Sequence, residues 1–236
     1  RRGRRGSRQP EPLPAAPGAR LKTAPSAADV VGVIAETSTW RAVGGWVPAV
    51  PEPDGRAAVV LVAGDRDTLA AATEQGADPL GDLGRAWADT DAGVLGWSTA
   101  GQTTGDGPTD VGLVVLTLRF DTVGVRTAST SITESGTARR AGRRLAEGLA
   151  APDLRVVLVV ADGLGVNGSS LASGLADVLP DVPVIGVLAG DGHRYASTWT
   201  FDGGRAAAGA IVAVGLCGDA LELHQGVSAG WHPVGP

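Results

Sequence analysis

The fold is decided by a stretch that occurs twice, VVLVAGD at residues 59–65 and VVLVVAD at residues 156–162. Each copy is a continuous apolar run that ends in an aspartate, which is typical of a strand buried on both faces of a sheet. Two further matches follow in the same order. Residues 94–100 match residues 184–190 at an offset of 90, and the segment starting at Gly112 matches the one starting at Gly209 at an offset of 97. The repetition predicts an internal duplication.

We therefore expect an α/β fold with mixed sheets, built from two duplicated β-helix-β-hairpin units that pack with pseudo-two-fold symmetry. The first repeat should span about residues 27–132 and the second about residues 133–236. A helix over residues 134–149, which carries apolar residues on one face, should join them. The strand ends of two such units should meet at a cleft, where α/β proteins usually place ligands.

Local patterns predict the elements inside each repeat. Residues 67–87 have helical content with a break near residues 76–79. Residues 112–118 and 122–129 are expected to form a hairpin, and residues 209–226 a second hairpin-like pair. Residues 1–26 are basic and rich in proline, so we expect a disordered, solvated tail outside the domain at residues 27–236. The chain contains no methionine, so we expect a fragment or a processed chain.

Composition excludes several classes of protein. The net charge of −5 argues against a general nucleic-acid binder, which needs a basic face for the phosphates. The single cysteine, Cys217, excludes an intramolecular disulfide and a cysteine-rich zinc site. No apolar run approaches the ~20 residues that cross a bilayer. We expect a cytoplasmic globular domain with no nucleic-acid or membrane partner.

Two motifs leave enzymatic alternatives open. Gly163-x-Gly165-x-x-Gly168 follows a predicted strand, which favours a dinucleotide-dependent oxidoreductase, but an acid at Asp162 would repel a pyrophosphate. Ser228 lies in a formal G-x-S-x-G pattern, which favours a serine hydrolase, but no helical segment follows it. We assign no catalytic residue, no metal ligand and no cofactor.

A binding role fits the strand-end residues better. Short polar side chains and bare amides past the predicted strands could hold a small zwitterion, with its carboxylate on N–H donors and its ammonium group on an aspartate. A tryptophan near the end of the chain could line the same pocket. The candidate ligand-binding residues are Ser98, Thr99, Asp162, Asp191, Gly192, His193 and Trp231. Capping of turns is an equally good explanation for Ser98, Thr99 and Asp191.

Three segments resemble a known family: GWSTAGQ at residues 96–102, VIGVLAGD at residues 184–191 and GWHPVGP at residues 230–236. In this order they look like the N-terminal domain of FIST proteins, and the resemblance spans about residues 29–236. The closing motif is the most specific part. Trp97 stands where the family usually has cysteine and Gln102 where it usually has an acid, so no ligand role is carried over to those two positions.

The resemblance implies a bacterial intracellular sensory domain that binds small ligands such as amino acids and is coupled to signal transduction. It supplies no established catalytic residues. It also implies a C-terminal FIST-type domain or another downstream signalling module as partner, because such a domain normally follows the closing motif. Our main hypothesis is a non-catalytic sensor whose small-molecule ligand binds between the two repeats.

Overall fold

The computed structural model describes residues 32–104 and 107–224. They belong to the second compact unit of the chain, Val31–Pro236. The tail predicted over residues 1–26 lies outside the described residues. The elements up to residue 120 are β1 (Val33–Arg41), β2 (Gly45–Val47), β3 (Ala57–Gly64), α1 (Arg66–Glu74), α2 (Pro79–Trp87), β4 (Gly93–Ser98), β5 (Gln102–Thr104), β6 (Gly107–Thr109) and β7 (Leu113–Phe120). Those that follow are β8 (Gly124–Ser131), α3 (Ile132–Ser135), α4 (Ala138–Leu149), β9 (Leu154–Ala161), α5 (Gly168–Ala176), β10 (Val184–Leu188), β11 (Thr200–Phe201), β12 (Ala206–Ala207) and β13 (Ala210–Cys217).

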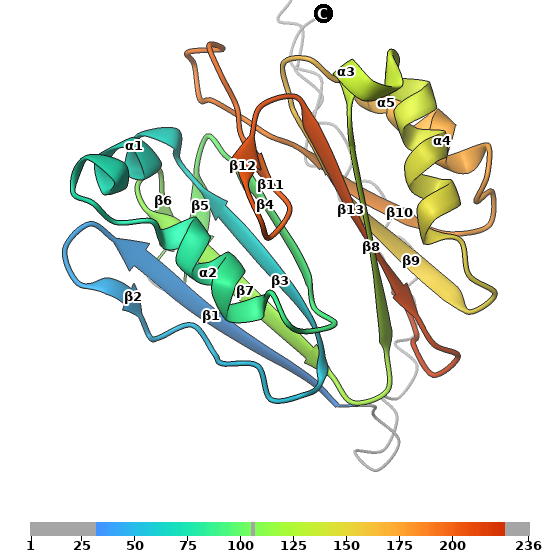
Figure 1. The fold of residues 1–236 in the computed structure, drawn as a ribbon, viewed down its shortest axis with the longest axis horizontal. Helices are drawn as coiled ribbons and strands as arrows, with labels where there is room; N and C mark the ends of the chain where they lie inside the picture. Colours follow the sequence, from blue (N-terminus) through green and yellow to red (C-terminus); the bar gives the residue numbers. More distant parts are fainter. Residues whose placement is uncertain (1–31, 105–106, 225–236) are drawn as a thin grey trace, which may run out of the picture. The chain divides into compact units, whose positions relative to one another are not determined.

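The larger sheet has the strand order β12-β11-β4-β3-β7-β1-β2 (Figure 1). β3 is parallel to β4 and antiparallel to β7, which in turn is antiparallel to β1. Val59, Val60 and Val62 of β3 are fully buried, as the continuous apolar run predicts. β11 reaches this sheet from far along the chain and pairs Thr200 with Trp97.

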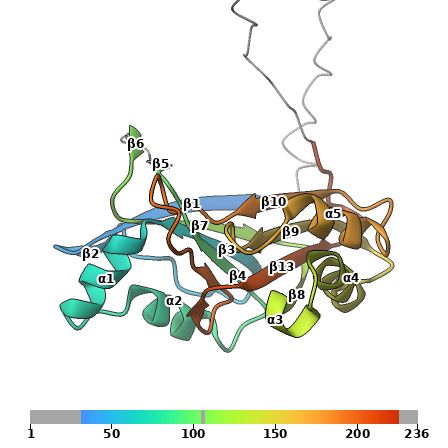
Figure 2. The ribbon, with the colours of Figure 1, turned by 90° about the horizontal axis from the view of Figure 1, so that it is seen from above.

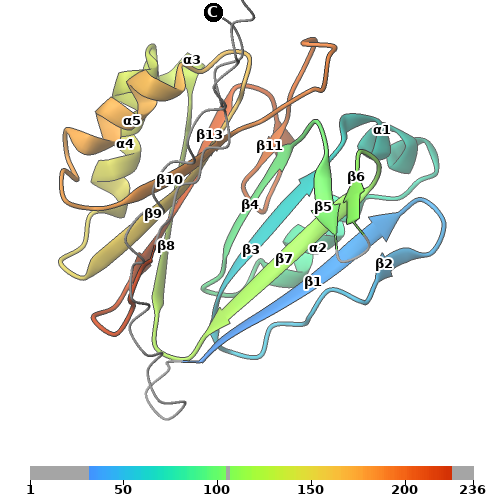
Figure 3. The same cartoon turned by 180° about the vertical axis from the view of Figure 1, so that it is seen from behind.

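The second sheet has the order β10-β9-β13-β8 (Figures 1 and 3). β9 is parallel to β10 and antiparallel to β13, and β13 is antiparallel to β8. This order and these directions are the same as those of β4-β3-β7-β1. The parallel register also agrees, because Gly96 pairs with Val62 and Gly186 pairs with Val159. The fold is therefore mixed α/β, and four strands of each larger sheet have the same order and the same relative directions.

Three apolar clusters bury the faces of these sheets. One joins α2 to the first sheet, with Leu83 and Trp87 against Val60 and Val62. A second cluster joins α4 and α5 to the second sheet. The third cluster contains residues of both sheets, among them Val59 of β3 and Val214 of β13. Alternate side chains of β3 therefore pack toward the helices and toward the other sheet.

Helices α4 and α5 pack closely because two glycines leave room for the neighbouring backbone. A Cβ atom at Gly142 would lie 2.3 Å from the Leu171 carbonyl oxygen, and one at Gly174 would lie 2.1 Å from the Arg139 carbonyl oxygen. The helix predicted over residues 134–149 begins later, at Ala138, with Thr137 as its N-cap. Gly136, at φ 74°, separates it from the short helix α3.

The first predicted hairpin is wrong. β7 pairs with β3 and β1, whereas β8 pairs with β13, so the two consecutive strands belong to different sheets. The chain passes from one sheet to the other at residues 121–123, although we expected the first repeat to continue to about residue 132. Consequently α4 does not join two units but lies between β8 and β9 of the second sheet. The predicted break between two helices near residues 76–79 is confirmed.

The second predicted pair is also different. β13 pairs with β9 and β8, and residues 225–226 lie outside the described residues. A two-stranded sheet, β5–β6, stands away from the two larger sheets in Figure 2. No helix of the described residues is long and apolar enough to span a membrane.

Candidate functional site

A cavity of about 740 Å³ opens at the carboxyl ends of β3 and β4. Its wall comes from the end of β1, the first turns of α1, the segment after β4, the segment between β6 and β7, and residues 191–194 after β10. The segments that follow β3, β4 and β10 therefore meet at one site. Strand ends of this kind are a common location for ligands in α/β proteins.

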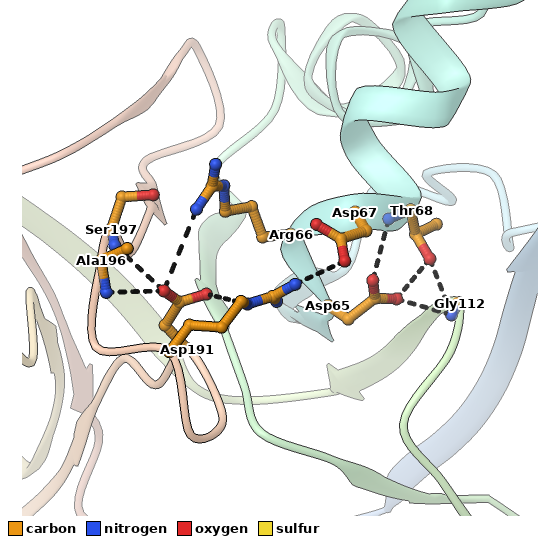
Figure 4. A network of polar contacts seen from close by, with 9 residues as sticks. Asp65, Arg66, Asp67, Thr68, Gly112, Asp191, Ala196 and Ser197 are labelled. Atoms are coloured by element: carbon orange, nitrogen blue, oxygen red, sulfur yellow. Dashed lines mark hydrogen bonds and ion pairs between the residues drawn. The ribbon is translucent and has the colours of Figure 1, made fainter.

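Asp65 fixes the start of α1 at this cavity. As the N-cap, its carboxylate accepts a hydrogen bond from the Thr68 amide at 2.9 Å. It also accepts from the Thr68 hydroxyl and, at 2.9 Å, from the Gly112 amide (Figure 4). The Gly112 amide is shared with the Thr68 hydroxyl oxygen at 2.9 Å. Asp65 thus holds α1 and the segment before β7 in place.

Asp191 organises the opposite wall. Its side chain is fully buried, and its carboxylate accepts from the amides of Ala196 at 2.9 Å and Ser197 at 3.0 Å (Figure 4). The Arg194 Nε atom donates to it at 3.2 Å. The hydrogen bonds from the Ser197 and Ala196 amides lower the pKa of Asp191, and the Arg194 charge lowers it further. Asp191 is therefore ionised and holds the loop over residues 191–197.

Ion pairs connect the two walls. Arg194 also donates to Asp67 in the first turn of α1, and a guanidinium nitrogen of Arg66 lies 3.9 Å from Asp191 (Figure 4). The arginines of these pairs are partly exposed, so solvent screens the ion pairs and weakens them. Their main consequence is geometric, because they tie α1 to a loop more than a hundred residues later in the chain.

Arg41 and Asp110 line the same cavity and are both exposed. Neither forms an ion pair with another residue of the described ranges. One guanidinium and one carboxylate that have no ion-pair partner among the described residues therefore line a common cavity. Such a pair can bind a ligand that carries both an anionic and a cationic group.

A family model, the FIST N domain, matches residues 69–236. The match covers well over half of the chain. The chain belongs to the FIST N-domain family. This family comprises sensory domains of signal transduction. The match begins inside α1, so β1, β2 and β3 precede it and nevertheless contribute to the larger sheet. No curated protein matches the chain.

This FIST N domain brings four of the seven candidate residues to the cavity: Thr99, Asp191, Gly192 and His193. Ser98 is buried beside it, and its hydroxyl oxygen accepts from the Trp199 amide at 3.0 Å. That bond makes Ser98 part of the connection between β4 and β11. Trp231 lies outside the described residues.

Asp162 is not in the cavity lining but in the corresponding place of the second sheet. Its carboxylate accepts from the Gly165 amide at 2.7 Å, the Thr198 hydroxyl at 2.8 Å and the Gly209 amide at 2.9 Å. The Leu164 amide donates to it as well. Burial alone would raise the pKa of Asp162, but these four hydrogen bonds outweigh burial and lower it. Asp162 therefore stabilises its own loop.

The glycine-rich loop gives no support to dinucleotide binding. The amides of Leu164 and Gly165, which would have to bind a pyrophosphate, both donate to Asp162. A Cβ atom at Gly163 would lie 1.9 Å from the Ala189 carbonyl oxygen, so this glycine is required by close packing of the loop. Ser228 lies outside the described residues. Within the described ranges no three side chains form a metal-binding group.

Sequence reasoning missed five charged residues that line the cavity: Arg41, Asp65, Asp67, Asp110 and Arg194. It also missed Arg66, which lies 3.9 Å from Asp191. One of them could have been predicted from the matched stretches of sequence. Asp65 stands at the same position of the matched stretch as Asp162, which we had selected. Asp110 and Arg41 had no such signal, because only the pairing of β1 with β7 brings the end of β1 to this site.

Proposed function

We propose that this FIST N domain senses a small zwitterion of amino-acid size, bound in the cavity at the ends of β3 and β4. The observation that carries the proposal is the placement of Arg41 and Asp110, both without a protein partner in the described residues, on one cavity of about 740 Å³. A volume of this size lies in the range of small-molecule sites.

Arg41 would bind the ligand carboxylate, because a guanidinium offers two parallel N–H donors to a planar anion. Asp110 would accept from the ligand ammonium group. His193 and Thr99, which also line the cavity, would contact the ligand side chain.

We propose recognition rather than catalysis. Ser98 is the serine nearest to the cavity among our candidates, and its hydroxyl is engaged with the Trp199 amide. His193 is the sole histidine lining the cavity among the described residues, and its side chain donates to or accepts from no described serine or acid. A nucleophile held by a base is the minimum for covalent hydrolysis.

Ligand binding would be transmitted through the ion pairs that connect α1 to the loop over residues 191–197. A ligand ammonium or carboxylate competes with Arg194 and Asp67 for partners, which changes how tightly the two walls are held together. Such a shift needs different ligand affinities for two arrangements of the walls. We propose a downstream module, such as a C-terminal FIST-type domain, as the receiver of the signal.

The shared strand order of the two larger sheets supports an origin by duplication. Asp65 accepts a hydrogen bond from the Gly112 amide, and Asp162 accepts one from the Gly209 amide. Each residue of the second pair lies 97 residues after its counterpart in the first pair. We propose that two copies of one ancestral unit, related by a pseudo-two-fold axis, gave rise to this domain, and that only the first retained an open strand-end cavity.

Thermal unfolding of the chain with each of the twenty amino acids tests the proposed ligand class. A ligand at 100 times its Kd adds about 2.7 kcal/mol, which raises the midpoint by roughly 5 to 10 °C. Arg41→Gln should weaken binding about tenfold or more, because a charge-assisted hydrogen bond is lost.

Arg140→Gln is the matched control, since Arg140 is an exposed arginine on α4 away from the cavity. It should leave the ligand-dependent shift unchanged. The proposal fails if no amino acid moves the midpoint, or if Arg41→Gln and Arg140→Gln respond alike to the ligand that does.

A further inference from the structure

The outer edge of β10 differs from the outer edge of β4, although the two strands hold the same place in their sheets. β4 is covered by β11, which runs antiparallel to it and pairs Phe201 with Gly96. Within the described residues β10 pairs only with β9. An uncovered edge offers unpaired backbone N–H and C=O groups to another strand.

The edge of β10 is also apolar. Ile185, Val187 and Leu188 are 42%, 38% and 47% exposed. A cavity of about 290 Å³ lies between this strand and α5, with Leu171 and Leu175 on the helix side and Gly186 on the strand side. Exposed apolar sheet edges are normally covered by another segment or protected by charged side chains, so the edge of β10 is a candidate binding surface.

The first sheet shows what fills the corresponding space. There the Phe201 side chain lies over Gly96, where a Cβ atom on the glycine would be 3.2 Å from the Phe201 Cβ atom. The ring reaches Gly84 of α2, and Phe201 is 1% exposed. One strand therefore supplies both the backbone pairing and an aromatic side chain between sheet and helix.

The two glycines can be compared directly because their registers agree. Gly96 pairs with Val62, and Gly186 pairs with Val159. Val159 lies 97 residues after Val62, and Gly186 lies 90 residues after Gly96. Around Gly96 a Cβ atom would contact Val62 and Phe201, but around Gly186 it would contact only Val159 among the described residues. The place that Phe201 occupies in the first sheet is filled by none of the described residues in the second.

We propose that the edge of β10 and the cavity beside α5, together the β10 groove, bind an extended segment of another polypeptide. The segment would run antiparallel to β10 and place a phenylalanine-like side chain over Gly186. This is recognition by strand addition, in which backbone hydrogen bonds supply affinity and a side-chain pocket supplies specificity.

A second copy of this chain fits the groove less well. Both phenylalanines of the chain, Phe120 and Phe201, are buried at 4% and 1% exposure and serve its own cores. The most exposed aromatic side chain of the described residues, Tyr195, has φ 52°, which is not the backbone of a strand. Neither phenylalanine of a second copy is therefore free to enter the groove, and we commit to a different polypeptide as the partner.

Fluorescence anisotropy of a labelled peptide with the sequence of residues 197–203, STWTFDG, tests the β10 groove on the full chain. We expect saturable binding that falls about tenfold or more when the peptide phenylalanine is replaced by alanine. Gly186→Val should reduce binding similarly, because its side chain fills the space meant for the ring.

Gly124→Val is the matched control, since Gly124 lies in β8 on the opposite edge of the same sheet and a Cβ atom there makes ordinary contacts. It should bind the peptide like the wild type, and circular dichroism should show all variants folded. No binding to the wild type, or equal loss in both variants, would overturn the proposal. So would a dimer seen by light scattering that Gly186→Val dissociates, or binding that appears only in Trp231→Ala, which would mean that the chain covers its own groove.

Discussion

Asp65 and Asp162 end corresponding strands of two sheets with the same order, yet their surroundings differ. Around Asp65 the chain carries charged residues, Arg66 and Asp67, and leaves a cavity open. Around Asp162 the corresponding positions are Gly163 and Leu164, and the loop packs directly on Ala189. A common backbone plan thus permits an open polar site in one half and a closed structural loop in the other, depending on a few side chains.

Replacing each aspartate by alanine should give the largest difference in stability between the two loops. Asp162→Ala leaves the Thr198 hydroxyl and the Gly209, Leu164 and Gly165 amides without their acceptor, and should cost about 3 to 5 kcal/mol of unfolding free energy. Asp65→Ala removes a helix N-cap on a less buried residue and should cost about 1 to 2 kcal/mol. Urea denaturation measures both.

Asp89→Ala, at an exposed aspartate after α2, is the control and should stay within about 0.5 kcal/mol of the wild type. Equal losses for Asp65→Ala and Asp162→Ala would show that the two loops are equally closed, against the comparison made above.

Substitutions at the residue after each aspartate, Gly163 and Arg66, should differ less in their effect on stability. Gly163→Ala places a Cβ atom 1.9 Å from the Ala189 carbonyl oxygen, so the loop must move and stability should fall by about 2 to 3 kcal/mol. Arg66→Ala, at the corresponding position, removes an exposed side chain with one long ion pair to Asp191 and should cost less than about 1 kcal/mol. Thermal unfolding of the two variants checks the difference, and a stable Gly163→Ala would mean that the second loop has room.

The smallest expected effect concerns how stability depends on pH at Asp162 and Asp191. The pKa values of Asp162 and Asp191 are both lowered in the folded state, so each contributes stability that is present above about pH 4, the unfolded value, and lost as the pH falls through the folded value. Asp162→Asn and Asp191→Asn should each flatten the loss of stability below about pH 4.

Salt should distinguish the two aspartates, because Arg194 and Arg66 contribute to the lowered pKa of Asp191, whereas hydrogen bonds from uncharged groups act on Asp162. Urea titrations at low and high salt measure this. An Asp162 contribution that falls with salt as steeply as that of Asp191 would contradict the assignment.

Local sequence predicted the buried strands and the helix break well. The apolar run at residues 59–63 became β3, and Gly76 and the segment before Pro79 separated α1 from α2, because burial on both faces and turn chemistry leave short-range signals. Four of the seven candidate residues line one cavity, and their role in ligand binding stays a prediction. The charged residues of the cavity were missed because only the fold brings them together from positions that are remote in the sequence.

Strand pairing was the main error, and its cause is physical. β7 and β8 are separated by three residues and look like a hairpin, but each pairs over its full length with a strand elsewhere, β7 with β3 and β8 with β13. Periodicity shows which faces of a strand are buried and says nothing about which strand lies beside it. The crossing of β11 to β4 left no local signal either, because a two-residue pairing is too short for one.

Residue types and spacing alone determined the α/β class of this chain and its repeated strand pattern, and the resemblance of three segments to a known family indicated FIST domains. The tertiary structure decided which sheet has an open cavity at its strand ends, which charges meet in that cavity and which sheet edge has no partner among the described residues. These features arise from contacts between segments about a hundred residues apart, and free energies of such contacts depend on packing that no short stretch of sequence contains.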